Sequence, residues 1–357
     1  MFVAWRDLRF ARGRFALMGT VIVLITLLVG LLSGLTAGLA RDNTSALTGL
    51  PADHLAFARP ADSQSVSFTA STVRPAQWRG LADEEGVESA EPLGIGTVNA
   101  KSGRHTAAVS AFGVRPDSGL APDTTAPGTA VLSTKAAKEL GVSTGDRVGL
   151  GGARLTVAAV SGDASYSHTP VVWTDLSDWQ HVTPTGGAGA RATVIALRTA
   201  PDADLKAADE AAGTESRTID DALTAIGSYQ AENGSLQLMR GFLFVISALV
   251  VGAFFTVWTI QRSADIAVLK ALGSSTRYLL RDALGQAVLM LVAGTAIGTG
   301  LATLIGVFVP DTVPFVLDPL TALGPAAVMT VLGLAGAALS VRRITSVDPL
   351  TALGSAR

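Results

Sequence analysis

Apolar residues along this chain of 357 residues gather in four long runs. The runs cover residues 15–39, 238–260, 284–309 and 320–341. A helix needs about 20 mostly apolar residues to cross a bilayer, and each run is long enough. The pattern therefore predicts four transmembrane helices, with a long and more polar insert between the first and the second.

Short stretches of β-branched and apolar residues alternate in the insert with Gly, Pro, Asp and Ser, which is typical of strands joined by turns. The expected strands are 65–68, 107–112, 130–132, 147–150, 155–160, 170–174 and 192–197, and the expected helices are 75–82, 133–140 and 203–212. Two dipeptides, Gly145-Asp146 and Gly151-Gly152, are expected to form turns. A further helix over 216–237 is expected to lead directly into the second span. The fold class is thus an α-helical membrane protein with a mixed α/β domain inserted between its first and second spans.

The balance of charge differs between the polar segments. Segments 1–14, 261–283 and 342–357 together hold eleven basic and four acidic residues, whereas 42–235 holds 14 basic and 23 acidic residues. Short segments rich in Lys and Arg stay in the cytoplasm, so we expect both termini inside and the α/β domain outside. The expected location is the plasma membrane of a bacterium, with the chain crossing it several times.

These patterns divide the chain into consecutive segments. The expected order is a cytoplasmic amphipathic helix (1–14), a first transmembrane helix (15–40), the extracytoplasmic α/β domain (41–235), a second transmembrane helix (236–260), a cytoplasmic helix (261–279), a third transmembrane helix (280–309), an outer loop (310–319), a fourth transmembrane helix (320–341) and a cytoplasmic tail (342–357). A cleaved signal peptide is the alternative for the first apolar run. That run exceeds the about 7–15 residues of a signal's apolar region, which favours an uncleaved span.

The segment 261–273, QRSADIAVLKALG, has the pattern of a short amphipathic helix between two spans. Ile266, Leu269 and Leu272 share one face, and polar side chains occupy the other. A helix in this place could transmit force between a soluble partner and the membrane. The alternative is a loop helix that only anchors the chain in the membrane interface.

Sequence motifs of catalytic chemistry are missing from the chain. It has no GxxxxGK[ST] loop for ATP, no HExxH, no GxSxG and no Cys/His cluster with metal spacing. Its four histidines, His54, His105, His168 and His181, are far apart in sequence and are interpreted as scattered surface residues. We therefore expect no enzyme, no resident metal, no bound catalytic cofactor and no nucleic-acid partner.

Two motifs resemble a known family. QRSADIAVLKALGSSTRYLL at 261–280 resembles the R-x-x-E-I-x-x-L-x-A-L-G segment of the MacB- and FtsX-type ABC transporter permeases, with Asp265 where Glu is usual. RRITSVDPLTAL at 342–353 resembles the D-P-x-x-A-L tail of the same family, and 145–160 is similar to its extracytoplasmic β-hairpin. The layout of spans agrees with this resemblance over the whole chain.

The resemblance implies a mechanism called mechanotransmission. A separate P-loop ATPase would bind on the cytoplasmic side of a dimer of permeases, and ATP-driven closure of the ATPase would tilt the helices and move the outside domains. The residues expected to couple the two subunits are Arg262, Asp265, Leu269, Lys270, Leu272 and Gly273.

Glycines in the first apolar run follow a GxxxGxxxG pattern, Gly30, Gly34 and Gly38, which lets another helix approach closely. Sequence leaves open whether that helix belongs to the same chain or to a second copy. Within the family, the layout is most similar to the HrtB-like haem-efflux permeases. This resemblance draws attention to Glu232 and Met239, which are two helical turns apart and share one face if the helix is continuous.

Carboxylate and thioether groups can both ligate haem iron, so Glu232 or Met239 is a candidate iron ligand. The three glycines would shape the pocket, and Arg240 could pair with a propionate. In the alternative interpretation Glu232 is a surface acid, Met239 fills space and Arg240 anchors the helix at the interface.

Two functions remain open from the sequence. In the first, the chain expels an amphipathic or apolar compound, haem above all, from the outer leaflet. In the second, it resembles FtsX in transporting nothing and regulates an outside partner such as a cell-wall hydrolase. A lipoprotein-releasing role ranks below both.

Overall fold

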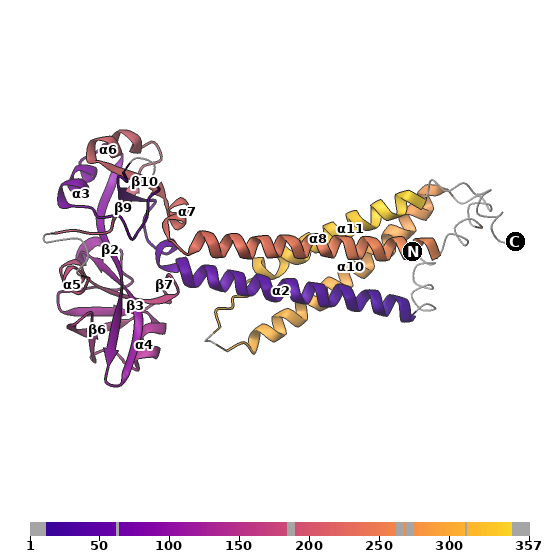
Figure 1. Cartoon of the computed structure of the whole chain (residues 1–357), viewed down its shortest axis with the longest axis horizontal. Coiled ribbons are helices and arrows are strands. Elements are labelled where there is room, and N and C mark those ends of the chain that lie inside the picture. Colours follow the sequence, from indigo (N-terminus) through magenta and orange to yellow (C-terminus); the bar gives the residue numbers. More distant parts are fainter. Residues whose placement is uncertain are drawn as a thin grey trace. The chain divides into compact units, whose positions relative to one another are not determined.

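The computed structural model describes residues 12–61, 64–183, 190–261, 268, 275–310 and 313–344 (Figure 1). The chain forms two compact units. One comprises Met1–Gly38 together with Gly234–Arg357, and the other comprises Leu39–Asn233.

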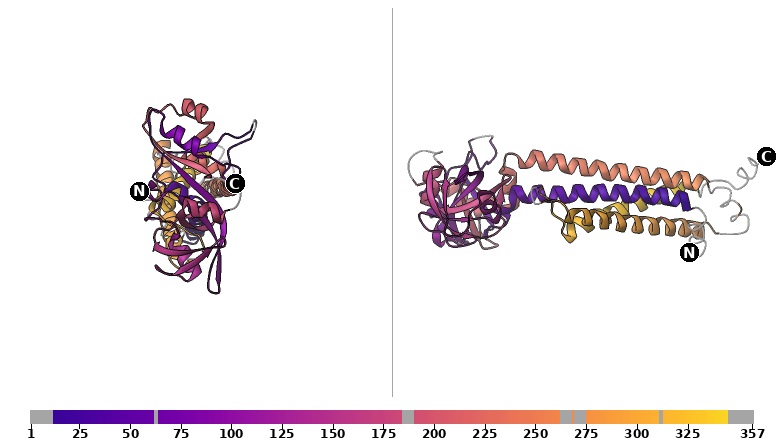
Figure 2. Two further views of the ribbon diagram at one scale, coloured as in Figure 1. Left: turned by 90° about the vertical axis from the view of Figure 1, so that its left-hand side faces the viewer. Right: turned by 90° about the horizontal axis from the view of Figure 1, so that it is seen from below.

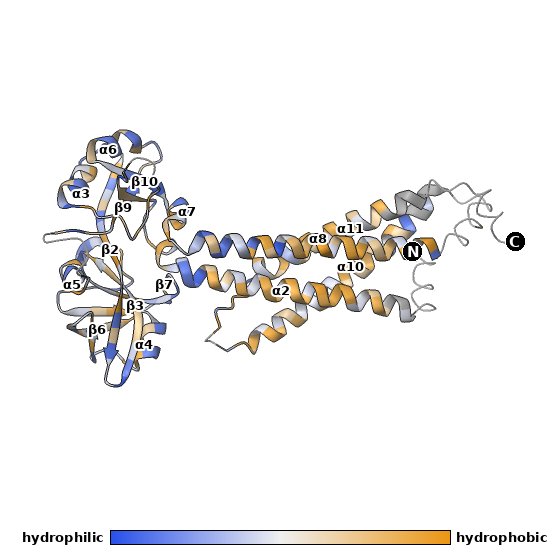
Figure 3. Cartoon of the chain, viewed as in Figure 1, coloured by the Kyte–Doolittle hydropathy of each residue, from blue (hydrophilic) through white to orange (hydrophobic). Residues whose placement is uncertain are grey.

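Four long helices are described, α2 (Arg12–Thr48), α8 (Tyr229–Gln261), α10 (Thr276–Val307) and α11 (Pro319–Ile344). Each contains a window that is long and apolar enough to cross a membrane, and apolar residues prevail along them in Figure 3. The predicted fold class, four such helices with an α/β domain between the first and the second, is confirmed. Helix α2 continues to Thr48, eight residues beyond the expected first span.

Small residues bring α2 and α10 together in the helical unit. A Cβ on Gly294 would lie 2.6 Å from a methyl of Ile22, and one on Gly298 would lie 2.7 Å from Cβ of Thr26. Residue numbers rise together along both helices at these contacts, so α2 and α10 are parallel. This is the direction expected of the first and third spans of a chain that crosses a membrane back and forth. Figure 2 shows the helices of this unit lying alongside one another.

An apolar core joins all four long helices. It contains Met18, Ile22, Val251, Phe255, Trp258, Ala287, Leu291 and Ala337. Many other apolar side chains of these helices are exposed, among them Leu249, Val257 and Leu304. Such outward-facing apolar side chains are stable in contact with lipid and costly in water.

The α/β unit is built on a ten-stranded sheet (Figure 1). Its strands are β1 (His54–Ala58), β2 (Val87–Ser102), β3 (His105–Val114), β4 (Thr129–Leu132), β5 (Arg147–Leu150), β6 (Ala153–Val160), β7 (Ser165–Tyr166), β8 (Thr169–Asp175), β9 (Val194–Thr199) and β10 (Thr214–Thr218). The order is β10-β1-β9-β2-β3-β8-β4-β6-β5, with β7 paired to β8. Strand β2 also pairs with β5, so the sheet closes on itself through β2, β3, β8, β4, β6 and β5.

Helices cover this sheet, and successive residues of a strand face different cores. The helices are α3 (Pro75–Ala82), α4 (Thr134–Leu140), α5 (Leu176–Val182), α6 (Leu205–Ala212) and α7 (Ile219–Ala222). In β1, Ala56 belongs to one core while Leu55 and Phe57 belong to the other. The second core also contains Ala46 and Leu47, so the last turns of α2 are part of the α/β unit.

The expected helices at 75–82 and 133–140 are confirmed as α3 and α4. The expected turn at Gly151-Gly152 joins β5 to β6, with φ of 54° and 99° at the two glycines. These positive values favour glycine and explain the dipeptide.

Two expectations within the insert are wrong. Residues 65–68 form no strand, and the expected helix over 216–237 is replaced at its start by β10 and α7. Residues Thr214–Thr218 instead pair antiparallel with β1 over five positions. Such pairing is decided by a distant strand, which local propensity does not reveal.

Candidate functional site

A tight turn of the α/β unit contacts the last turns of α2. Strands β7 and β8 pair antiparallel and leave only Ser167 and His168 to connect them. Both residues have positive φ, 48° and 62°. Two such residues are typical of the type I′ turns that join twisted strands, although glycine and asparagine are more usual there.

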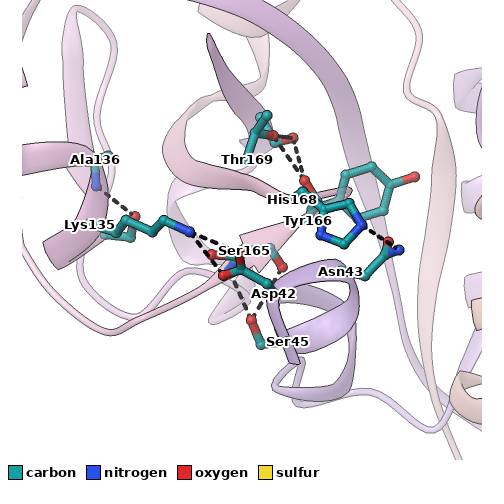
Figure 4. Close-up of polar contacts among 11 residues, drawn as sticks. Asp42, Asn43, Ser45, Lys135, Ala136, Ser165, Tyr166, His168 and Thr169 are labelled. Carbon is teal, nitrogen blue, oxygen red and sulfur yellow. Dashed lines mark hydrogen bonds and ion pairs between the residues drawn. The ribbon is translucent and has the colours of Figure 1, made fainter. Parts of the chain in front are cut away.

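Main-chain and side-chain contacts fix the turn to α2 (Figure 4). The backbone N–H of Ser167 donates to the carbonyl of Asn43 at 3.0 Å, and that of His168 donates to the carbonyl of Asp42 at 3.2 Å. The carboxylate of Asp42 pairs with Nζ of Lys135 at 2.9 Å. One turn further along the helix, Oγ of Ser45 accepts a hydrogen bond from the N–H of Ser165 at 2.9 Å.

Four side chains then meet between this turn, α2 and the start of α8. We call Asn43, His168, Ser228 and Glu232 the polar cluster. Nε2 of His168 lies 2.7 Å from Oε2 of Glu232, and Nδ2 of Asn43 lies 3.3 Å from the same oxygen. A carboxylate only accepts hydrogen bonds, so both nitrogens donate to Glu232. Oγ of Ser228 lies 3.5 Å from Nδ2 of Asn43.

Burial differs sharply within the polar cluster. Asn43 is 1% exposed, and its Oδ1 has no hydrogen-bond partner among the described residues. The side chains of His168 and Glu232 are 33% and 45% exposed. The cluster is therefore buried at Asn43 and partly exposed at His168 and Glu232.

Tyr166 precedes the turn and lies among aromatic rings. Its ring makes edge contacts with Phe68 and Phe112, with centroids 5.7 and 5.6 Å apart. Burial raises the pKa of the Tyr166 hydroxyl well above its ordinary value. The phenol is therefore neutral over the physiological range and cannot supply a phenolate ligand.

The structure places the predicted ligand residues as follows. Glu232 lies in the first turn of α8. It contacts His168, one of the four histidines that we had interpreted as scattered surface residues. Met239 is 48% exposed on the same helix. Arg240 is bonded to the side-chain oxygen of Gln237 at 2.6 Å.

The glycine stripe of α2 contacts other parts of the same chain. A Cβ on Gly30 would lie 2.9 Å from Cβ of Ala302, and one on Gly34 would lie 2.6 Å from the ring of Phe315. The carbonyl of Gly34 also accepts a hydrogen bond from the N–H of Val316 at 3.0 Å, and Gly38 lies against Pro314. These contacts explain the three glycines as close-approach positions within the chain. Their role in shaping a ligand pocket stays a prediction.

The six expected coupling residues, Arg262, Asp265, Leu269, Lys270, Leu272 and Gly273, lie outside the described residues, and their role stays a prediction. In the part of the chain that the structure describes, no three His, Cys, Asp or Glu side chains are grouped so as to hold a metal ion. Sequence reasoning missed Asn43 and His168. They contact Glu232 although they are 189 and 64 positions away from it in the sequence. A local sequence motif cannot predict a contact between residues so far apart in the chain.

Comparisons with known proteins agree with this architecture. The MacB-like periplasmic core domain matches residues 15–214, and the FtsX-like permease C-terminal domain matches residues 238–349. A protein of Staphylococcus epidermidis, provisionally named as the hemin transport system permease HrtB, is 27% identical over 358 residues, covering 99% of each chain. Its namesake in Staphylococcus haemolyticus is 27% identical over 366 residues, again covering 99% of each chain.

Among solved structures, the extracellular domain of the ABC-type transporter YknZ from Gram-positive bacteria matches with 16% identity and a TM-score of 0.35. That match covers 46% of this chain and 98% of the other. The MacB-like match alone spans more than half of the chain, and the FtsX-like match adds the helices that follow it. The chain therefore belongs to the family of MacB-like and FtsX-like ABC transporter permeases.

Proposed function

We propose that this chain is the permease subunit of an efflux pump that expels hemin, or a similar amphipathic compound, from the outer leaflet of a bacterial plasma membrane. The observation that carries the proposal is the similarity to permeases named for hemin transport, which extends over 99% of both chains. A match of that extent includes the helices and the α/β unit together.

A separate ATPase drives the pump in this proposal. The chain has no phosphate-binding loop of its own, and ABC permeases work with an ATPase partner. The amphipathic segment 261–273 would receive the force, and two copies of the permease would form the membrane part. Segments 1–14, 261–283 and 342–357 hold more basic than acidic residues, which favours a cytoplasmic ATPase on their side of the membrane.

Continuous helices support force transmission through the chain. Helix α2 runs unbroken from Arg12 to Thr48, and α8 from Tyr229 to Gln261. Each includes residues of both compact units. A helix is stiff along its axis because each residue adds a main-chain hydrogen bond, so movement at one end is carried to the other.

Iron ligation is assigned to Glu232 or Met239 in this proposal, Arg240 is available for a propionate, and Gly30, Gly34 and Gly38 are assigned a role in shaping the pocket. Ferric iron is a hard cation that accepts carboxylate oxygen, and methionine is an axial ligand in other haem proteins. The exposed thioether of Met239 and the partly exposed carboxylate of Glu232 support this assignment.

Growth in hemin tests the proposed function. Deleting the gene should sensitise the cells to hemin, and the wild-type chain expressed with its ATPase should restore growth. The double variant Glu232→Ala, Met239→Ala should fail to restore it and should lose the Soret shift that the purified wild type produces. Glu210→Ala, which removes an exposed acid of α6, is the matched control and should behave as wild type.

Two outcomes would contradict the proposal. An unchanged Soret spectrum in the double variant would overturn the ligand assignment. Altered cell shape without any sensitivity to hemin would overturn export and favour regulation of a cell-wall hydrolase.

A further inference from the structure

The two oxygens of the Glu232 carboxylate have different surroundings. Oε2 accepts hydrogen bonds from Nε2 of His168 at 2.7 Å and from Nδ2 of Asn43 at 3.3 Å. Oε1 takes part in no hydrogen bond within the described part of the chain, and the side chain is 45% exposed. One oxygen is thus held by two donors while the other is open to a ligand.

The donors themselves are fixed by their elements. The backbone of His168 is anchored to α2 by its N–H bond to the carbonyl of Asp42, and its φ of 62° is set by the two-residue turn. Asn43 is almost fully buried, yet its Oδ1 has no partner among the described residues. Burying an unpaired amide oxygen is costly, so a purely structural position would favour an apolar side chain.

We propose that His168 and Asn43 are positioning residues that hold Glu232 so that Oε1 ligates a ferric centre. The proposal rests on the hemin efflux proposed above and names the atoms that would recognise the iron. Ligands of metals are commonly oriented by hydrogen bonds from a second set of side chains, and losing one such partner typically weakens metal binding about 10–100-fold.

A structural role is the competing explanation. Glu232 lies in the first turn of α8, where a negative charge is favourable, and His168 could simply join the turn to that helix. A structural role predicts that any ligand bound nearby is weakened to the same extent, whether or not it carries iron. A positioning role predicts that only iron-containing ligands are affected.

The test titrates the purified full-length chain with hemin and with iron-free protoporphyrin IX. His168→Gly is the informative variant, because glycine adopts the positive φ of this turn without strain. We expect hemin binding to weaken about 10–100-fold with a changed Soret band, and protoporphyrin IX binding to stay at the wild-type value. His181→Ala, which alters an exposed histidine of α5, should leave both affinities unchanged.

Asn43→Leu is a second variant that removes the other donor and keeps a side chain of similar size. It should show the same selective loss of hemin affinity, and it decides the matter if His168→Gly does not fold. Equal hemin affinity and an unchanged Soret band in the folded variants would overturn the positioning role, as would an equal loss for both porphyrins. If the wild type itself binds no hemin, the proposed function fails first and the positioning role fails with it.

Discussion

At the scale of single residues, two glycines make room for a tryptophan. Gly94 and Gly113 are paired across β2 and β3, and a Cβ on either would overlap Trp179 of α5, which is 4% exposed. Gly94→Ala should therefore lower the free energy of unfolding by about 1–3 kcal/mol, because the added methyl overpacks the site. Denaturant unfolding followed by tryptophan fluorescence would measure the change.

The matched control is Gly80→Ala in α3, where a Cβ would meet no atom within 4 Å. Alanine is favoured over glycine inside a helix, so this variant should raise the free energy of unfolding by about 0.5–1 kcal/mol. Opposite signs for the two substitutions are expected. A Gly94→Ala protein as stable as wild type would show that Trp179 does not need the glycine pair.

At the scale of elements, the start of α11 depends on a reciprocal cap. Oδ1 of Asp318 accepts a hydrogen bond from the N–H of Thr321 at 2.7 Å, and Oγ1 of Thr321 accepts one from the N–H of Asp318 at 2.9 Å. The hydrogen bond that the carboxylate accepts from the backbone of Thr321 is the largest cause that lowers the pKa of the Asp318 carboxyl. Asp318→Ala should speed hydrogen exchange in the first turn of α11, measured by mass spectrometry at neutral pH.

The same cap predicts a dependence on pH. Because the folded-state pKa of Asp318 is below its unfolded value, its stabilisation is present above the unfolded pKa and is lost as pH falls through the folded value. Asp318→Asn keeps an oxygen acceptor without the charge and should remove this acid dependence. Equal exchange in wild type and Asp318→Ala at neutral pH would refute the role of the cap.

At the scale of the whole molecule, the proposed orientation can be tested with single cysteines, because the sequence has none of its own. Ser143→Cys lies at an exposed position of the α/β unit, and Ser355→Cys lies in the C-terminal tail. A maleimide that cannot cross membranes should label residue 143 in intact cells, and should label residue 355 only after lysis. Labelling of residue 355 in intact cells would reverse the proposed topology.

Much of the architecture was predictable because it depends on local properties. Hydropathy along the chain indicated the four apolar helices and the α/β domain between the first two. Turn chemistry predicted the Gly151-Gly152 connection of β5 and β6. The helix predicted over 216–237 was wrong at its start because residues Thr214–Thr218 form a strand that pairs with β1. Local properties do not predict such long-range pairing.

The sequence by itself determined the class of the protein, because a chain in lipid must form long apolar helices and such helices are visible as runs of apolar residues. Only the tertiary structure decided which residues meet. It brought His168 and Asn43 to Glu232, set Phe315 against Gly34, and closed the sheet through β2 and β5. These contacts join positions far apart in the chain, and their formation depends on packing that no local pattern records.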